Sequence, residues 1–315
     1  MAPTRLGADR HTRIAARWSN RRPQPAGPLV QSPPSVVGSL PTGAAPGAAT
    51  SIIGVRLDSG AATHVGLHRR ENQDRYLAHG TVFAVADGLG GYAGGATAAG
   101  IATEVLARDE PVESLTQLIA LVGSANLAIF EAARDDPHLF EMSTTLCVLA
   151  GIGNAAPPSR LAVCNVGDSR LYALAADRFS RVTIDHTISE NLVRDGVISA
   201  AEAATDVDRH TLTRAVGFER RVHVDGWELV AAPGTRFLLC SDGLTNEVRD
   251  AEIAATLRSV EGAGAAAGRL VERAVRPGHG RDNVTAVVVD VVGDPELQPD
   301  RSDQLVVAFR PAVLA

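Results

Sequence analysis

The 315-residue sequence contains no lysine, so all 30 of its basic residues are arginines. Chemistry that needs a lysine amine, including P-loop nucleotide hydrolysis and Schiff-base catalysis, is therefore excluded. Aromatic residues make up only 4% of the chain, and its apolar runs fall far short of the roughly 20 residues of a membrane-spanning helix. With 45% hydrophobic and 21% charged residues, the composition is that of a globular protein without a membrane span.

Cysteine is also scarce. Cys147, Cys164 and Cys240 lie singly inside apolar stretches, with neither CxxC nor histidine spacing around them. This pattern supports neither a disulfide framework nor a zinc cluster. We therefore expect buried free thiols in a reducing compartment.

Charge and proline are unevenly distributed along the chain. Residues 1–50 contain six arginines, one acid (Asp9) and eight of the 17 prolines, whereas the other 24 arginines face 35 acids. The first 50 residues have no apolar periodicity and cannot bury enough surface to offset the entropy lost on ordering, so we predict a disordered arm. No apolar segment follows the basic residues, as a secretory signal would require, and an Arg-rich transit-like peptide stays open as an alternative. The excess of acidic residues in the rest of the chain, residues 51–315, needs an explanation.

Short β-branched runs predict strands, and apolar residues at helical spacing predict helices that come in pairs. Paired helices between runs of strands favour an α+β layered fold over a doubly wound parallel sheet. A polar segment, residues 186–217, is long enough to be a flap and contains a predicted short helix at 187–194. The clearest predicted strands are 82–86, 161–166, 236–240 and 284–292, and the predicted helices are 94–107, 113–134, 250–259 and 262–276.

Four aspartates lie at the ends of these predicted strands. Asp87, Asp168 and Asp242 follow strands, and Asp282 precedes one. A single aspartate in such a place is most often a helix cap or a turn former. Four of them at one sheet edge would repel each other unless cations neutralised them. Oxygen ligands without paired histidine or cysteine favour Mg²⁺ or Mn²⁺ over Zn²⁺.

Two neighbouring segments fit the same interpretation. Residues 86–95 place five glycines around Asp87, which lets the backbone approach a ligand closely. Residues 66–74 include Arg69, whose planar guanidinium can bind two oxygens of a phosphate. Each segment alone also fits an ordinary structural turn.

Six short motifs, taken in order, resemble the PPM family, the metal-dependent type 2C serine/threonine protein phosphatases, in its bacterial form. The resemblance covers roughly residues 52–292. The motifs are RxxNxD (69–74), DGxGG (87–91), Ser-Thr-Thr (143–145), GDSR (167–170), SDGL (241–244) and DNxT (282–285).

The resemblance implies a four-layer αββα sandwich, in which two central antiparallel sheets are flanked by helix pairs. It also implies a metal centre at one edge of the sandwich. The domain organisation that follows is a disordered Pro/Arg-rich arm at 1–50, a PPM-type phosphatase domain at 51–293 and a short C-terminal tail at 294–315.

By the same resemblance, the core site holds two ions of Mn²⁺ or Mg²⁺. Asp87 would bridge them, and the Gly88 carbonyl would help to hold one. Asp242 and Asp282 would be ligands of the other ion. Asp74 would be an outer ligand that acts partly through water.

The resemblance further implies a third metal ligand, Asp168, shared with Asp242. Arg69 would hold the substrate phosphate. A metal-bridging water or hydroxide would then attack phosphorus in line, with Asp87, Asp242, Asp282 and Arg69 as the catalytic set. The implied activity is metal-dependent hydrolysis of phosphoserine and phosphothreonine in proteins, opposing bacterial Ser/Thr kinases.

The sequence departs from the family pattern at three positions. Gln73 stands where many relatives carry Glu. Because a neutral amide can still order metal-bound water, we expect this change to tune the activity of the site without abolishing it. Leu89 fills the position of a histidine that is proposed as general acid in many eukaryotic members, so the proton donor is open, with metal-bound water as the default. Ser143 replaces a glycine at a turn. We interpret His64, His68, His186 and His279 as surface or structural residues, with a role beside the site as the alternative.

Two other functions stay open at this level. Gln73 and the missing histidine suggest a weak or inactive member that binds phosphoproteins, and the same centre could act on small phosphoesters. The expected partners are phosphorylated proteins and a Ser/Thr kinase, without nucleic acid or a membrane span. Residues 293–315 are too short and too polar to span a membrane, so we expect a cytoplasmic enzyme, and we expect a monomer.

Overall fold

A computed structural model describes residues 55–90, 94–107, 110–153, 160–176, 178–293 and 306–309. The predicted arm at 1–50 lies outside these residues, as does most of the predicted tail. The described chain forms two compact units. Residues 187–212 belong to one, and the other described residues form the second, larger unit.

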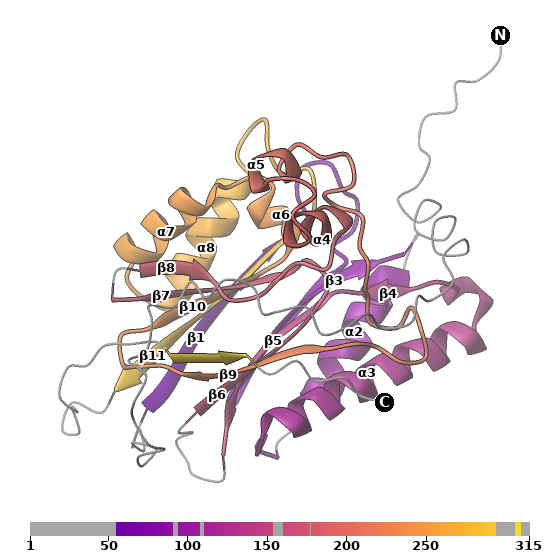
Figure 1. Ribbon diagram of the computed structural model, residues 1–315, viewed down its shortest axis with the longest axis horizontal. Helices are drawn as coiled ribbons and strands as arrows, with labels where there is room; N and C mark the ends of the chain where they lie inside the picture. Colours follow the sequence, from indigo (N-terminus) through magenta and orange to yellow (C-terminus); the bar gives the residue numbers. More distant parts are fainter. Residues whose placement is uncertain are drawn as a thin grey trace. The chain divides into compact units, whose positions relative to one another are not determined.

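The larger unit contains two antiparallel sheets (Figure 1). Along the first sheet the strands are β1 (Val55–His64), β11 (Val284–Gly293), β10 (Arg236–Cys240), β7 (Arg170–Ala175) and β8 (Arg178–Arg181). Along the second they are β12 (Val306–Phe309), β9 (Asp225–Val230), β6 (Arg160–Val166), β5 (Leu146–Ile152), β3 (Val82–Leu89) and β2 (Asp74–His79), with β4 (Ser143–Thr144) paired to β3. The strand β12 lies in the segment predicted as a tail and pairs with β9.

The helices come in pairs, as the sequence predicts. Figure 1 shows one pair on each side of the two sheets. The first pair is α2 (Gly94–Leu106) and α3 (Leu115–Asp135), followed by a 3₁₀ turn η1 (Pro137–Leu139). The second is α7 (Asp250–Ser259) and α8 (Ala263–Ala274), preceded by the short α6 (Asp242–Thr245).

Three buried clusters separate the four layers. Phe83, Leu149 and Phe237 belong to the cluster that the two sheets enclose between them. Apolar residues of α2 and α3 pack on the second sheet, and those of α7 and α8 pack on the first. Because both sheets are covered on both faces, a strand such as β5 is apolar and buried throughout. The predicted α+β, four-layer αββα sandwich is confirmed.

The helix α3 is the one described helix that is long and apolar enough to cross a membrane, judged by length and composition. Its mean hydropathy is 1.4. The short apolar runs of the sequence had indicated no segment of this kind. Leu118, Ile119 and Val122 on its inner face are buried against the second sheet. Packing in the domain core therefore accounts for its apolar residues.

The three cysteines are free and buried, as predicted. Burial raises the pKa of Cys147 and Cys164 well above the usual range, and it raises the pKa of Cys240 to about 12. These thiols therefore stay protonated at neutral pH, and they are unsuited to nucleophilic attack.

The smaller unit corresponds to the predicted flap. It contains α4 (Ile188–Arg194) and α5 (Ala200–Ala203), so the short helix predicted at 187–194 is confirmed. The Thr187 side chain caps α4, and Ser199 forms a capping box with Glu202 at α5. Ser189 Oγ donates to Asp206 Oδ1 at 2.7 Å and ties α4 to the returning chain.

Candidate metal centre

Two of the predicted metal ligands face each other across neighbouring strands. Asp74 begins β2 and pairs directly in register with Asp87 of β3. The sequence placed Asp87 after a strand ending at residue 86, but β3 continues to Leu89, so Asp87 and Gly88 lie inside it. Opposed residues of an antiparallel pair have Cα atoms about 4.5–5.5 Å apart, which brings the two aspartates close together.

The other three aspartates reach the same edge from the first sheet. Cys240, the last residue of β10, pairs with Ala286 near the start of β11 and with Arg170 at the start of β7. Asp242 follows β10 at the first residue of α6, Asp282 lies two residues before β11, and Asp168 lies in the turn before β7. The structure thus brings all five predicted carboxylates together.

Burial makes Asp74 an unusual carboxyl group. It is 2% exposed, and burial raises its pKa to about 7, against hydrogen bonds from Thr285 and Ser241 that favour the charged form. The negative charges of Asp242 and Asp282 raise this pKa further. Such repulsion means that the site favours a cation or protons over five bare carboxylates.

Asp87 lies at the centre of the repulsion. Its pKa is raised well above the usual range by burial first, and then by the charges of Asp74, Asp242, Asp282 and Asp168. The charges of all four other carboxylates therefore repel that of Asp87. This central position is the one expected for an acid that bridges two cations.

The donor atoms present fit hard divalent cations. Oδ1 of Asp74 is buried and accepts no hydrogen bond from the described residues, whereas its Oδ2 accepts one from Ser241 Oγ at 2.8 Å. Backbone oxygens gather beside Gly88, because a Cβ placed there would lie 2.2 Å from the carbonyl oxygen of Gly95 and 2.7 Å from that of Gln73. Carboxylate and carbonyl oxygens are the ligands that Mg²⁺ and Mn²⁺ prefer.

Thr145 holds the strand that carries Asp87. Its Oγ1 accepts the Asp87 backbone N–H at 3.0 Å, and its own N–H donates to the Asp87 carbonyl at 2.9 Å. The same hydroxyl shares a 2.7 Å hydrogen bond with Ser169, which follows Asp168. The Ser-Thr-Thr motif contains Thr145, but the sequence alone showed no role for it.

Asn283 fixes the loop that carries Arg69. Its Nδ2 donates to the carbonyls of Val65 and Glu71, both at 2.9 Å, and its Oδ1 accepts the Gln73 N–H at 2.8 Å. Sequence reasoning named the DNxT motif but missed this function. The only signal was the position of the asparagine, directly after Asp282.

Arg69 lies beside Asp282, with Nη2 2.7 Å from Oδ2. Burial tends to lower the pKa of Arg69, but the hydrogen bond to Asp282 and the charges of Asp87 and Asp242 raise it overall. Its side chain is 50% exposed. Asp282 thus orients the guanidinium through Nη2. The other N–H donors of the guanidinium can bind an incoming anion.

The turn that carries Asp168 depends on Gly167 and His186. Gly167 has φ +105°, and a Cβ there would lie 2.7 Å from the Thr145 side chain. Gly167 N–H donates to His186 Nδ1 at 3.1 Å, and His186 N–H donates to the Gly167 carbonyl at 2.9 Å. Nδ1 is therefore the acceptor and the ring proton lies on Nε2, 3.2 Å from Asp225 Oδ2.

This arrangement makes His186 a structural residue, as its sequence context predicts. It is 2% exposed, and burial lowers its pKa below the usual value. His279 is bound to Glu247 at 2.7 Å, His64 Nδ1 accepts the Gly66 N–H, and His68 is exposed. None of these contacts places an imidazole on the five aspartates.

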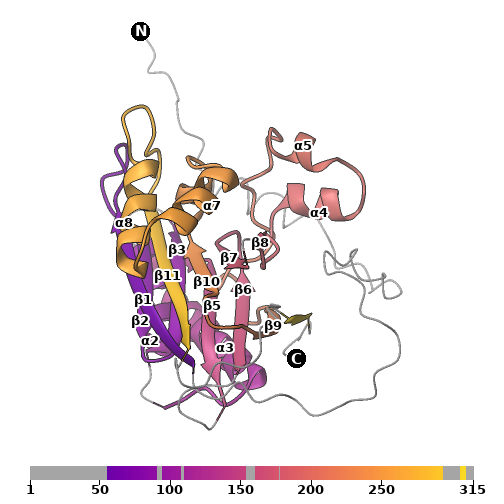
Figure 2. The ribbon, with the colours of Figure 1, turned by 90° about the vertical axis from the view of Figure 1, so that its left-hand side faces the viewer.

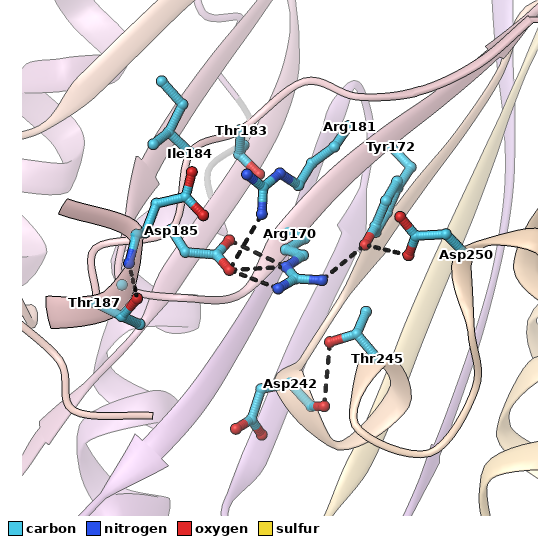
Figure 3. Close-up of polar contacts among 12 residues, drawn as sticks. Arg170, Tyr172, Arg181, Thr183, Ile184, Asp185, Thr187, Asp242, Thr245 and Asp250 are labelled. Atoms are coloured by element: carbon cyan, nitrogen blue, oxygen red, sulfur yellow. Dashed lines mark hydrogen bonds and ion pairs between the residues drawn. The ribbon is translucent and has the colours of Figure 1, made fainter. Parts of the chain in front are cut away.

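An ion pair holds the other end of the same turn (Figure 3). Arg170 donates to both oxygens of Asp185: Nε lies 3.1 Å from Oδ1 and 3.0 Å from Oδ2, and Nη2 lies 2.7 Å from Oδ2. Its Nη1 donates to the Tyr172 hydroxyl at 3.0 Å, and that hydroxyl donates to Asp250 at the start of α7. Asp185 and His186, adjacent in sequence, thus anchor the turn on both sides of Asp168.

We expect Asp185→Asn to destabilise the protein by about 3 kcal/mol, because it leaves a largely buried guanidinium without its countercharge. Urea unfolding measures the change. The matched control is Arg249→Ala, which removes an exposed pair with Glu252 and should leave the stability close to that of the wild type. Equal effects for the two variants would contradict the assigned role of the ion pair.

Two positions that depart from the family pattern lie opposite each other. Leu89 pairs in register with Ser143 of β4, and the Ser143 side chain is buried. Leu89 therefore places an apolar side chain where many eukaryotic relatives have a histidine. Gln73 uses its backbone N–H to bind Asn283, a contact that does not depend on whether its side chain is an amide or a carboxylate.

The chain is similar to known proteins in both sequence and fold. Residues 67–272 match the protein phosphatase 2C family. The chain is 39% identical over 232 residues to serine/threonine protein phosphatase PstP of Mycobacterium tuberculosis, covering 72% of this chain and 43% of that protein. It therefore spans less than half of the length of that relative.

Two further matches cover most of their counterparts. Serine/threonine phosphatase stp of Listeria innocua is 33% identical over 230 residues, which are 70% of this chain and 86% of that protein. A crystal structure of the PstP catalytic domain with two manganese ions superposes with a TM-score of 0.67 at 36% identity, covering 76% of this chain and 99% of that one. Because these matches cover most of the chain and the sandwich superposes on that of PstP, the chain belongs to the protein phosphatase 2C family.

Proposed function

We propose that this protein is a metal-dependent phosphatase that hydrolyses phosphoserine and phosphothreonine in proteins. The observation that carries the proposal is the convergence of five aspartates and Arg69 at one edge of the sandwich. The names of the family and of the two relatives support the same activity.

The metal-binding residues of the proposal are those that the site brings together. Asp87 and the Gly88 carbonyl, with Asp242, Asp282 and Asp74, would hold two ions of Mn²⁺ or Mg²⁺. Asp168 and Asp242 would hold a third. When bound, such ions lower the pKa of water and withdraw negative charge from phosphoryl oxygens. The PstP structure with two manganese ions supports the assignment.

Arg69 has a separate task. Its guanidinium is held by Asp282 at 2.7 Å and keeps donors exposed, so it can bind the non-bridging oxygens of a phosphate and fix its orientation. Leu89 has no proton to give the departing seryl or threonyl oxygen, and we assign that proton to water by default. The buried, protonated cysteines are not available as nucleophiles, and no phosphoenzyme is needed.

Release of phosphate from a phosphothreonine peptide tests the proposal. We expect turnover with added Mn²⁺ and none after chelation. Isothermal titration with Mn²⁺ separates the alternative of a phosphoprotein-binding module, because such a module would bind the peptide without hydrolysis and without two metal sites. A wild-type protein without metal-dependent activity would overturn the proposal.

We expect Arg69→Ala to lower kcat/KM about 100-fold, because a charged donor that faces the phosphoryl group is lost. The loss should be similar for a phosphopeptide and for p-nitrophenyl phosphate, since both present the same phosphate. Arg69→Lys should recover only part of the activity, because an ammonium lacks the planar fork. Full activity of Arg69→Ala would remove Arg69 from the proposed site.

Within the cell, the enzyme would oppose a Ser/Thr kinase by acting on the proteins that the kinase phosphorylates. We place it in the cytoplasm as a monomer, without nucleic-acid partners. The three buried free cysteines support a reducing compartment. Cell fractionation and sedimentation test these assignments, and recovery of the protein in the membrane fraction would contradict them.

A further inference from the structure

Two surface loops meet beside Arg69. One joins β1 to β2 through residues 65–73, and the other joins α8 to β11 through residues 275–283. The Leu67 N–H donates to the Gly280 carbonyl at 2.7 Å, and Asn283 binds Val65 and Glu71 of the first loop. Figure 2 shows the two loops side by side above the ends of β1 and β11.

Glu247 binds the backbone of Arg281, and the Arg281 side chain is exposed to solvent. The Arg281 N–H donates to Glu247 Oε1 at 3.3 Å, and the side chain is 77% exposed. The side chain of Arg281 also pairs with Glu247, but the distance from Arg281 Nε to Glu247 Oε1 is long, at 3.9 Å. Glu247 is already bound by His279 at 2.7 Å, so it neutralises the Arg281 guanidinium only weakly.

Arg70 provides a second open charge on the first loop. It is exposed, and it pairs with no carboxylate among the described residues. Arg160 and Arg236, by contrast, lie within 3.0 Å of an acid. Residues 65–73 and 275–283 together contain four arginines and two acids, one of which is Glu71. The two loops therefore carry an excess of positive charge next to Arg69.

We propose that Arg70 and Arg281 form a basic rim that selects phosphorylation sites flanked by negative charge, either acidic side chains or a second phosphate. The inference rests on the proposed function, in which Arg69 binds the phosphate to be removed. An extended peptide advances about 3.3 Å per residue, so side chains one to three residues from the phosphorylated residue can reach the neighbouring loops. Because residues 51–315 contain 24 arginines and 35 acids, an acidic substrate needs such a local positive surface.

The test compares two phosphothreonine peptides of equal length, one with Asp and Glu around the phosphothreonine and one with Lys, in the presence of Mn²⁺. For the wild-type chain we expect a KM about 3- to 10-fold lower for the acidic peptide, as two exposed charge contacts would supply. In Arg70→Gln/Arg281→Gln the two KM values should become similar. Turnover of p-nitrophenyl phosphate should be unchanged, because the small ester does not reach the rim.

The matched control is Arg56→Gln, an exposed arginine at the far end of β1, about 26 Å along the strand from His64. Like each substitution at the rim, it removes one positive charge. This variant should keep the lower KM for the acidic peptide. Equal KM values for the two peptides in the wild type, or an equal loss of preference in Arg56→Gln, would overturn the basic rim. Absence of hydrolysis of either peptide and of the small ester would instead overturn the proposed phosphatase function.

Discussion

Replacing Asp87 by asparagine is expected to lower kcat/KM for a phosphothreonine peptide by at least about 1,000-fold at saturating Mn²⁺. Asp87 is the carboxylate on which all four other aspartates act, and it lies opposite Asp74 in the strand pair. Asparagine keeps the shape of the side chain but removes the negative charge that two cations would share. The measurement is steady-state phosphate release over a range of Mn²⁺ concentrations.

The fold should survive this substitution. The hydrogen bonds that hold Asp87 to Thr145 come from the backbone of Asp87, so asparagine preserves them. Asp58→Asn, at a half-exposed position on β1 paired with Arg56, is the matched control and should retain full activity. An Asp87→Asn enzyme within tenfold of the wild type, with a normal melting curve, would show that Asp87 is not at the reacting centre.

Removal of divalent metal is expected to lower the melting temperature of the wild-type protein. At free Mn²⁺ 100 times above the dissociation constant, each occupied site stabilises the folded state by about 2.7 kcal/mol. One kcal/mol corresponds to roughly 2–4 °C for a domain of this size, so each site should contribute about 5–10 °C. Thermal unfolding with Mn²⁺ and with EDTA measures the difference, and coincident curves would contradict the metal centre.

The chelated protein should also lose stability as the pH rises. The pKa of Asp74 is about 7 in the folded protein and 3.8 in the unfolded chain, so between these values the folded state binds more protons. The stability that this group contributes is complete below pH 3.8 and is lost as the pH rises through 7, with a magnitude on the order of 4 kcal/mol. Asp74→Asn should reduce this dependence in EDTA, while Asp87, whose pKa is also raised, keeps part of it. The same substitution should weaken stabilisation by Mn²⁺. A chelated wild type with constant stability from pH 5 to 8 would contradict the repulsion among the carboxylates.

Local sequence signals were sufficient for most of the layered fold. Continuous apolar runs marked strands that are buried on both faces, so the prediction for 236–240 matches β10 and that for 284–292 falls one residue short of β11. Apolar residues at helical spacing marked α7 within its observed bounds. The strand that carries Asp87 was predicted too short, because the polar and glycine residues at 87–88 end the apolar run although the backbone continues to pair.

By itself, the sequence determined the set of candidate ligands, because the chemistry of a hard cation demands oxygen donors and the short motifs supply them in order. It did not determine how those residues are held. Asp74 faces Asp87 through strand register, Asn283 binds a loop some 210 positions earlier, and Ser241 binds Asp74 across 167 positions. These contacts join segments that are distant in sequence, and hydrogen bonds of this kind form only when the sheets fix donor and acceptor at the same edge. Only the tertiary structure therefore decided which residues hold the metal centre in place, and that the charges of Arg70 and Arg281 are exposed.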